Sequence, residues 1–164
     1  TPKKPAATVT AVPKEEPAAA TGGEARDVRL YWVRVSDDSV IHLEKTSRKI
    51  NVGDSPLTAT VRTILKGPSS DDLNRGLQSV IPPGTRLLSA YVQNGTAFLN
   101  FSEEFQYNPT GAEGARAQLR QIVWTATEFD TVKAVQILIE GKRQAFLGGD
   151  GIAIGKPLSR SDLN

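Results

Sequence analysis

Two adjacent glutamates, Glu103 and Glu104, are the residues of this chain that come nearest to a catalytic pair. Paired carboxylates can hydrolyse glycosides when both face one bound sugar. Neighbouring side chains of an extended segment point to opposite sides, so these two would not share a site. We interpret them as part of a solvated turn, with Ser102 capping the turn and Phe105 tucked back toward the domain.

The chain has a single histidine, His42, and no cysteine. The missing cysteines exclude disulfides, zinc-thiolate sites and cysteine nucleophiles. A Ser-His-Asp arrangement stays open, because its members can be distant in sequence, but no nucleophile-elbow motif accompanies it. We interpret His42 as a half-buried or solvent-facing strand residue, and we expect no metal site and no catalytic residues.

A glycine-rich run, GGDGIAIGKP at residues 148–157, invites comparison with a phosphate-binding loop. The spacing fails, because Asp150 stands where such a loop needs glycine and Pro157 replaces the hydroxyl residue that would hold magnesium. No helix follows to supply amide donors. We therefore predict a glycine-rich turn before a short strand at Ile152–Ile154, and no cofactor.

The charge balance names no class of ligand. The chain of 164 residues carries 20 Lys and Arg against 18 Asp and Glu, a net charge of +2. No basic run is interleaved with aromatic residues, so we expect no nucleic acid partner. No stretch approaches the ~20 apolar residues of a membrane-spanning helix, so a membrane would be reached only through an anchor outside this sequence.

The clearest structural signal is the stretch TRLLSAYVQNGTAFLNFSEEF. Asn94 and Gly95 tolerate the positive φ angles of a type I′ turn, which predicts a two-residue hairpin between strands Leu87–Gln93 and Thr96–Phe101. The strand ends that face each other across the turn fix the remaining register. One face is then apolar and consists of Val92 with Ala97, Ala90 with Leu99, and Leu88 with Phe101.

The opposite face of this hairpin carries Tyr91 against Phe98 and Ser89 against Asn100. Two interpretations of the aromatic pair stay open. It could be covered by the N-terminal or C-terminal strands of the domain itself. If it is exposed instead, such a patch usually marks an interaction surface.

Trp124 is the third candidate for a partner surface. It lies off the apolar stripe formed by Leu119, Ile122 and Ala126 when each helical residue advances by ~100°. It could face a partner, or it could pack at the flank of the domain under the C-terminal tail. Tyr91, Phe98 and Trp124 are therefore the candidate site residues.

The remaining periodic segments predict strands and helices on both sides of the hairpin. They are strands over 27–35 and 39–50, a helix from a cap at Asp54 or Ser55 to the break at Gly67-Pro68, a loop with one helical turn over 69–85, a helix over 112–128, and a strand over 132–141. We predict an α+β domain with one mainly antiparallel or mixed sheet and two helices on one face.

The first 26 residues are rich in Pro, Ala, Thr, Lys and Glu and have no apolar period. Such a segment cannot bury enough surface to offset its ordering entropy. We predict a disordered linker over 1–26 and a folded domain over 27–164. Because the chain contains no Met and begins at Thr1, we expect a signal or anchor to lie upstream.

Several spaced motifs of the chain resemble the GerMN domain, the sporulation and spore germination family. They are the break Lys66-Gly67-Pro68, the segment Ile81-Pro82-Pro83-Gly84-Thr85, the hairpin ending in Phe101-Ser102, the helix end Thr125-Ala126-Thr127-Glu128-Phe129 and the strand from Val135 to Gly141. The resemblance is strongest over residues 57–142. Ala126 stands where the family often has Leu.

The resemblance implies an extracytoplasmic domain of a lipoprotein or membrane-anchored protein in the bacterial cell envelope. It also implies an α+β fold similar to the ring-building modules of bacterial secretion assemblies, and no known enzymatic activity. The family supplies no catalytic residues to transfer to this chain. Its signature glycines and prolines have structural chemistry, namely backbone freedom and rigidity.

Two functions of different classes follow. The first is a non-enzymatic envelope module that assembles with protein partners or with itself. The alternative is a peptidoglycan or glycan-binding module that uses the face of Tyr91 and Phe98 as an aromatic platform. An enzyme that uses Glu103 or Glu104 is disfavoured by the geometry expected for adjacent carboxylates.

Overall fold

The computed structural model describes residues 25–51, 53, 55–149 and 151–164. Three sequence predictions touch residues outside these ranges: the linker up to residue 24, the alternative helix cap Asp54, and Asp150 of the glycine-rich run. The described part begins with β2 (Ala25–Val35), so Ala25 and Arg26, which the sequence placed in the linker, belong to a strand.

A long antiparallel ribbon opens the domain. β2 pairs along its whole length with β3 (Ile41–Asn51), from Ala25 opposite Asn51 to Val35 opposite Ile41. Inside β2, Leu30 and Trp32 are fully buried. Both strands match the sequence prediction to within a few residues.

Two helices of very different length follow the ribbon. α2 (Pro56–Lys66) begins where the Ser55 hydroxyl accepts a hydrogen bond from the Thr58 N–H at 3.3 Å, as the sequence predicted. It ends at Gly67, whose φ of 97° favours glycine. α3 (Ser70–Asn74) is the predicted single helical turn and starts in a capping box.

The predicted hairpin is present as β4 (Leu87–Gln93) and β5 (Thr96–Phe101). The register is the predicted one from the turn to the pair of Ser89 with Asn100. Beyond that point Phe101 lies opposite Leu87 and not Leu88, so the predicted pairing of Leu88 with Phe101 is wrong. The cause is a β-bulge, which inserts one extra residue and shifts the register.

The second half of the chain completes the sheet and covers one of its edges. α4 (Gly111–Ala126) leads to β6 (Ala134–Ile139), which pairs in parallel with β5. The short elements are η1 (Glu103–Gln106) before α4, and β7 (Phe146–Leu147), β8 (Ile152–Ala153) and η2 (Arg160–Leu163) after β6. Among the described residues of the glycine-rich run, the predicted short strand is present as β8 and is one residue shorter than predicted.

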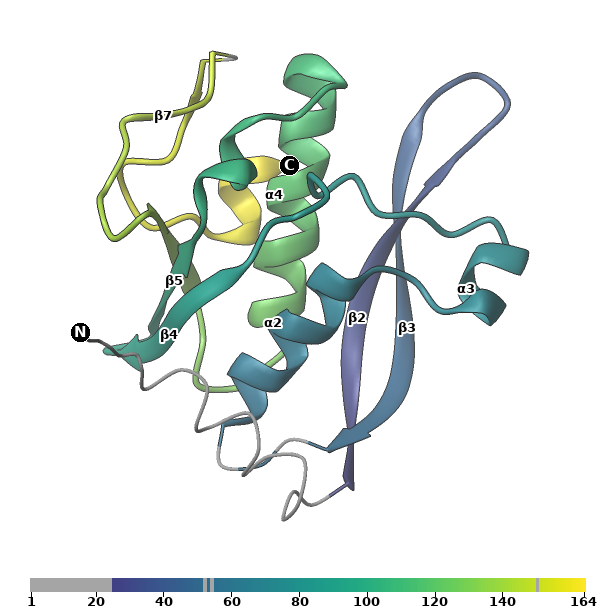
Figure 1. Cartoon of the computed structure of the whole chain (residues 1–164), viewed down its shortest axis with the longest axis horizontal. Helices are drawn as coiled ribbons and strands as arrows, with labels where there is room; N and C mark the ends of the chain where they lie inside the picture. Colours follow the sequence, from purple (N-terminus) through teal and green to yellow (C-terminus); the bar gives the residue numbers. More distant parts are fainter. Residues whose placement is uncertain (1–24, 52, 54, 150) are drawn as a thin grey trace, which may run out of the picture.

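The α+β class is confirmed, but the strands of the described chain fall into three sheets and not one. Figure 1 shows α2 and α4 between the mixed sheet β4–β5–β6 and the ribbon β2–β3. The ribbon is hydrogen-bonded to α4 and not to the mixed sheet. The Tyr31 carbonyl accepts from Gln121 Nε2 at 3.1 Å, and the Tyr31 N–H donates to Thr125 Oγ1 at 3.2 Å. Side-chain contacts of this kind leave no periodic signal in the sequence.

One continuous core joins these layers. Its largest fully buried side chains are Trp32, Phe101, Phe105, Leu30, Ile64, Leu77, Leu99, Leu119, Ile122 and Ile137. Because the ribbon, both long helices and the mixed sheet all contribute to it, the described residues fold as one unit.

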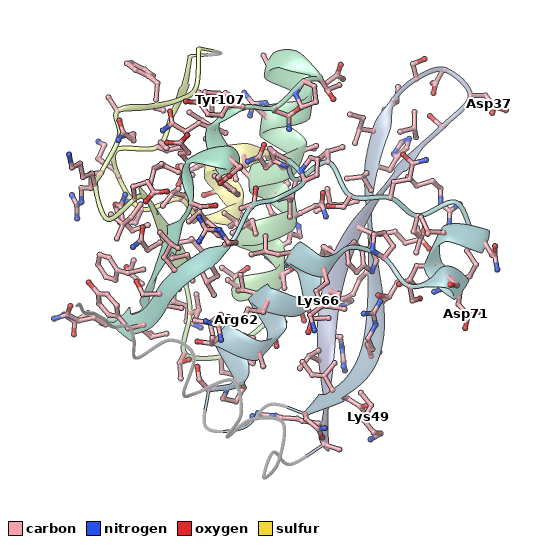
Figure 2. All side chains as sticks on the ribbon, in the orientation of Figure 1. Asp37, Lys49, Arg62, Lys66, Asp71 and Tyr107 are labelled. Atoms are coloured by element: carbon pink, nitrogen blue, oxygen red, sulfur yellow. The ribbon has the colours of Figure 1, made fainter. Side chains whose placement is uncertain are left out.

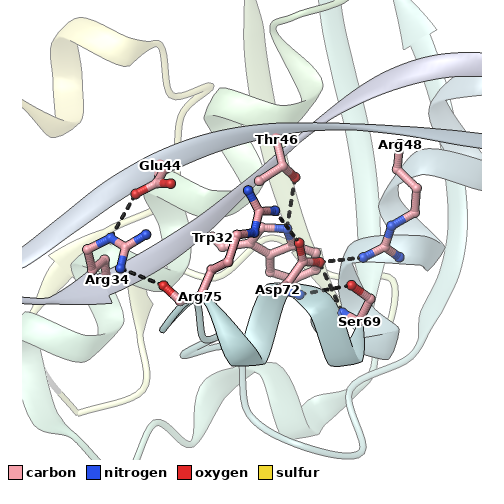
Figure 3. Close-up of polar contacts among 8 residues, drawn as sticks. All are labelled: Trp32, Arg34, Glu44, Thr46, Arg48, Ser69, Asp72 and Arg75. Atoms are coloured by element: carbon pink, nitrogen blue, oxygen red, sulfur yellow. Dashed lines mark hydrogen bonds and ion pairs between the residues drawn. The ribbon is translucent and has the colours of Figure 1, made fainter.

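A polar cluster attaches α3 to the ribbon (Figure 3). The Asp72 carboxylate is 5% exposed and accepts hydrogen bonds from Ser69 N–H at 3.0 Å, Arg48 Nη2 at 2.7 Å and Arg75 Nη2 at 3.0 Å. Burial raises the pKa of Asp72, but the bonds from Ser69, Arg75 and Arg48 together hold that pKa below its usual value. The cluster keeps the charged face of β3 in contact with α3.

Candidate partner-binding surface

Tyr91 and Phe98 form a stacked pair on the face of the mixed sheet that is turned away from the helices. Their ring centroids are 4.8 Å apart and their planes differ by 6°. The side chains of Ala97 and Leu99, on the other face of β5, are fully buried in the core. Tyr91 is 51% exposed and Phe98 is half-buried, so the pair presents an aromatic surface to solvent.

The turn that positions this pair has the predicted conformation. Asn94 has a φ of 52° and Gly95 a φ of 82°. Both angles are positive, as a type I′ turn requires, and the twist of this turn matches that of the flanking strands. The turn therefore holds Tyr91 directly opposite Phe98.

The C-terminal segment covers the neighbouring part of the same face. Gln136 lies beside Phe98 in the β6 register, is fully buried, and donates from Nε2 to the Ile154 carbonyl at 3.2 Å. The sequence left open whether the domain's own strands cover the pair of Tyr91 and Phe98. The C-terminal segment covers the adjacent Gln136, and Tyr91 stays exposed.

Trp124 lies elsewhere, on α4 and under the C-terminal segment. It is half-buried against the core, and the Arg160 guanidinium lies 5.5 Å from its ring centroid. Arg160 Nη2 also donates to the Trp124 carbonyl and to Glu128 Oε2, each at 3.0 Å. The structure therefore favours the packing interpretation of Trp124 and does not join it to the pair of Tyr91 and Phe98.

Glu103 and Glu104 lie in a 3₁₀ turn and not in an extended segment. The Ser102 hydroxyl beside Glu104, helped by nearby Arg86, holds the pKa of the Glu104 carboxyl below its usual value. A general acid of a glycosidase needs a raised pKa. Glu104 is therefore not suited to be such a general acid.

Ser102 precedes this turn but does not cap it through its side chain. Its hydroxyl oxygen instead accepts the Arg86 N–H at 2.9 Å, and its own N–H donates to the Arg86 carbonyl at 2.9 Å. Phe105 is fully buried and stacks on Phe101 with centroids 4.2 Å apart. Ser102 therefore holds the predicted cap position without a side-chain cap, and the predicted tuck of Phe105 is confirmed.

His42 does meet a serine and an aspartate at the exposed turn between β2 and β3. Its Nε2 lies 3.3 Å from Ser36 Oγ, and the Ser36 hydroxyl donates to Asp38 Oδ1. A catalytic triad needs the aspartate on the other imidazole nitrogen, where it fixes the tautomer of the histidine. Here the carboxylate bonds the serine itself, so this is a turn contact without triad geometry.

Across the residues that the structure describes, no group of three or more His, Asp or Glu side chains could hold a metal ion. Within the same residues, no helix has the length and apolar character needed to cross a membrane.

The structure contains a groove between α2 and β4 that the sequence did not predict. Its volume is about 470 Å³. The described residues that line it are Arg62, Leu65, Lys66, Thr85, Arg86, Leu87 and Leu88. The four-residue spacing of Arg62 and Lys66 indicated a shared helix face, but no local pattern placed this face beside Arg86.

A larger groove, of about 1030 Å³, lies between the start of α4 and the C-terminal segment. Arg116 and Lys156 line it together with Glu113 and Asp162. This balance of charges points to no particular class of ligand.

Comparison with known proteins places the fold. A family model described as "Germane: Sporulation and spore germination" matches residues 29–145. The chain is also similar to the spore germination protein GerM of Bacillus subtilis (strain 168), with 30% identity over 96 residues. That match covers 58% of this chain and 26% of GerM, so the chain spans about a quarter of its relative.

Two solved structures share the architecture. The tandem GerMN domains of the sporulation protein GerM from Bacillus subtilis superpose with a TM-score of 0.69 and 24% identity, over 84% of this chain and 46% of that chain. A candidate lipoprotein from Clostridium perfringens superposes with a TM-score of 0.60 and 25% identity, over 84% and 89%. The chain therefore carries a GerM-type domain and belongs to the Germane family of sporulation and spore germination.

Proposed function

We propose that this domain is a non-enzymatic envelope module that binds a protein partner through the sheet face of Tyr91 and Phe98. The observation that carries the proposal is the exposure of a stacked aromatic pair on a rigid hairpin. Aromatic side chains that already have a fixed geometry lose little entropy on binding and are enriched among the residues that dominate interfaces. The pair is held by a tight turn on one side and by β6 on the other.

The candidate catalytic groups of the described chain support a binding role by their geometry. Glu103 and Glu104 lie in a 3₁₀ turn, where Glu103 is exposed and Glu104 is half-buried with a lowered pKa. Ser36, His42 and Asp38 touch in an order that does not activate the serine. A scaffold with a stacked aromatic surface and no aligned nucleophile and base is suited to recognition.

The cell envelope is the proposed location. Among the relatives, one is named as a sporulation protein and another as a candidate lipoprotein. A lipid or membrane anchor elsewhere in the protein would hold the domain at the membrane surface, where partners of the envelope are accessible.

A glycan such as peptidoglycan is the second candidate ligand, and the same pair favours it. A half-exposed tyrosine ring supported from behind by a parallel phenylalanine ring is a flat apolar platform. A sugar ring could stack on the free face of Tyr91. Ser89 and Asn100, which flank the pair on this face, would supply hydrogen bonds.

Two assays run side by side separate these candidates. In the first, the full-length protein is cross-linked in its own cells and the products are identified by mass spectrometry. In the second, the purified domain is mixed with insoluble peptidoglycan and sedimented. The proposed function predicts cross-linked proteins and no co-sedimentation above that of an unrelated protein of similar charge.

The double variant Tyr91→Ala with Phe98→Ala connects either result to the surface. We expect it to fold, because Tyr91 is half-exposed, and to lose the cross-linked products. Tyr107→Ala is the matched control, because Tyr107 is 65% exposed and lies outside the hairpin. A folded double variant that keeps every cross-linked product would contradict the proposal.

A further inference from the structure

The outer edge of β4 is open along the described chain. β4 is the terminal strand of the mixed sheet, and no described strand or isolated bridge pairs with its outer side. The opposite edge differs, because β6 exchanges two hydrogen bonds with Leu158: its Val135 N–H donates at 2.9 Å and its Val135 carbonyl accepts at 2.8 Å. The β6 edge is thus partly occupied by the domain's own chain, and the β4 edge of this sheet is the one left unpaired in the described chain.

The direction of the main-chain groups follows from the hairpin. Residues that flank a two-residue turn form a hydrogen-bonded pair, and the next pair directs its N–H and C=O groups outward. Val92 and Ala90 therefore direct these groups away from β5. The carbonyl of Phe101 agrees with this alternation, because it points to the β6 side and accepts the Glu140 N–H at 2.9 Å.

The sequence of this edge lacks the usual protection against pairing. β4 reads LLSAYVQ and contains neither a charged residue nor a proline. Exposed edge strands normally carry such residues, or a bulge, to prevent the addition of another strand. The bulge between Leu87 and Ser89 protects the start of β4, which leaves residues 89–93 as the open part.

The lining of the groove beside this edge indicates which charge an added strand would carry. Figure 2 labels Arg62 and Lys66 on α2, next to β4. Together with Arg86 they supply three basic residues to the groove, and its described lining contains no acidic residue. The apolar part of the lining comes from Leu65, Leu87 and Leu88.

We propose that β4 binds an extended peptide segment of a partner protein by strand addition, with apolar side chains alternating along the segment and a carboxylate at the end that reaches the groove. The main chain of the peptide pairs with Ala90 and Val92. Its carboxylate meets Lys66 and Arg86. This inference deepens the proposed function, since it rests on the protein nature of the partner and adds the mode of binding.

A second copy of the chain is the less suitable occupant. Antiparallel pairing of two β4 strands keeps both α2 helices on the same side of the joined sheet. Because the two strands run in opposite directions, each basic groove rim would then lie near the partner copy's turn, where Asn94 and Gly95 offer no opposite charge. An acidic peptide meets the same rim with opposite charge.

The test is an NMR titration of the ¹⁵N-labelled domain with the blocked peptide acetyl-Glu-Val-Thr-Val-Thr-Val-Glu-amide. We expect the amides of Ala90 and Val92 to shift and their hydrogen exchange to slow by about tenfold or more, as new hydrogen bonds protect them. The control is the same peptide N-methylated at every valine and threonine, which cannot donate along either edge and should leave β4 unchanged. Equal effects of both peptides, or shifts confined to β3, would overturn strand addition.

Val92→Pro removes an outward N–H without touching the bonds to β5 and should abolish peptide binding while the thermal midpoint stays near that of the parent. If this variant does not fold, Val92→Lys keeps the backbone and places a charge on the edge, with the same expected loss.

Lys66→Glu with Arg86→Glu should weaken the binding of the Glu-ended peptide by about tenfold and leave that of a Gln-ended peptide unaffected. An equal change in affinity for both peptides, from the parent to the charge variant, would refute the role of the basic rim.

The outcome is separable from that of the proposed function. Cross-linked protein products that depend on Tyr91 and Phe98, together with no response of β4 to either peptide, would keep the envelope role and overturn strand addition. A dimer in analytical ultracentrifugation that Val92→Pro dissociates would identify a second copy as the occupant and overturn the peptide proposal.

Discussion

β3 and β4 are both terminal strands of their sheets, and they differ in the number of charged residues along that edge. β3 reads IHLEKTSRKIN and carries a histidine, a glutamate, two lysines and an arginine. β4 reads LLSAYVQ and carries no ionisable group except the tyrosine hydroxyl. Charged side chains discourage the addition of a strand. The edge of β3 should therefore resist pairing with another chain, and the edge of β4 should permit it.

The charges of β3 also hold the ribbon in place. Arg48 pairs with Asp72 of α3 at 2.7 Å, and Glu44 pairs with Arg34 of β2 at 2.8 Å. The open part of β4 makes no comparable ion pair, because it has no charge to offer. The comparison indicates that charged side chains protect the edge of β3, whereas β4 presents an uncharged and unpaired edge.

The largest expected effect comes from removing the Asp72 carboxylate, which connects α3 to β3. Asp72→Ala removes a nearly buried carboxylate that accepts from Arg48, Arg75 and Ser69. We expect a loss of about 2–4 kcal/mol in the free energy of unfolding, because two arginines and a helix N-terminus lose their partner. Urea unfolding measures it. Asp71→Ala is the matched control, and an equal loss there would refute the special role of Asp72.

The next effect falls on the hairpin that presents β4. Gly95→Val forces a β-branched residue to a φ of 82°, which should cost about 1–3 kcal/mol of folding free energy. Gly149→Ala is the control, since an added Cβ meets nothing within 4 Å there. A Gly95→Val variant as stable as the parent would show that the turn type is wrong.

Acid should weaken the contacts that hold the β2–β3 ribbon to the rest of the domain. Asp72 and Glu128 both have folded-state pKa values below their usual ones: burial opposes this at each site, and hydrogen bonds from Ser69 to Asp72 and from Tyr31 and Arg160 to Glu128 outweigh it. The stability they contribute is present above the unfolded-state pKa of about 4 and is lost as pH falls through the folded value. Urea unfolding between pH 7 and 3 should therefore show a decline that is shallower in Asp72→Asn. An identical pH dependence in the two proteins would contradict this.

The smallest effect should come from the segment that precedes the ribbon. We expect that deletion of residues 1–24 leaves the thermal midpoint within a few degrees of the parent, because the composition of that segment offers little apolar surface to bury. Differential scanning calorimetry measures the midpoint. A larger drop would mean that this segment packs on the domain and supports β2.

The sequence was a good guide wherever the signal is local. Asn94 and Gly95 predicted the hairpin, Ser55 and Gly67 predicted both ends of α2, and the stacked partners Tyr91 and Phe98 followed from the register. Each of these depends on contacts between residues close in the chain, so residue type and spacing contain the information.

Contacts distant in the chain were not predictable in this way. The division into three sheets depends on Gln121 and Thr125, which bind the main chain of Tyr31 some 90 residues earlier. The bulge at Leu88 leaves the alternation of side chains intact up to Ser89 and has no residue signature of its own. Asp72 could have been noticed, because Ser69 three residues before it has capping-box spacing, but its contact with Arg48 joins separate elements.

The most direct test of the comparison between the two edges is site-specific photo-cross-linking in the cells that produce the protein. A photoreactive phenylalanine derivative is placed at Tyr91 of β4 in one strain and at Lys49 of β3 in another, both positions being well exposed. An open β4 edge beside a protected β3 edge should give cross-linked protein products from position 91 and none above background from position 49. Products from position 49 with none from position 91 would contradict it.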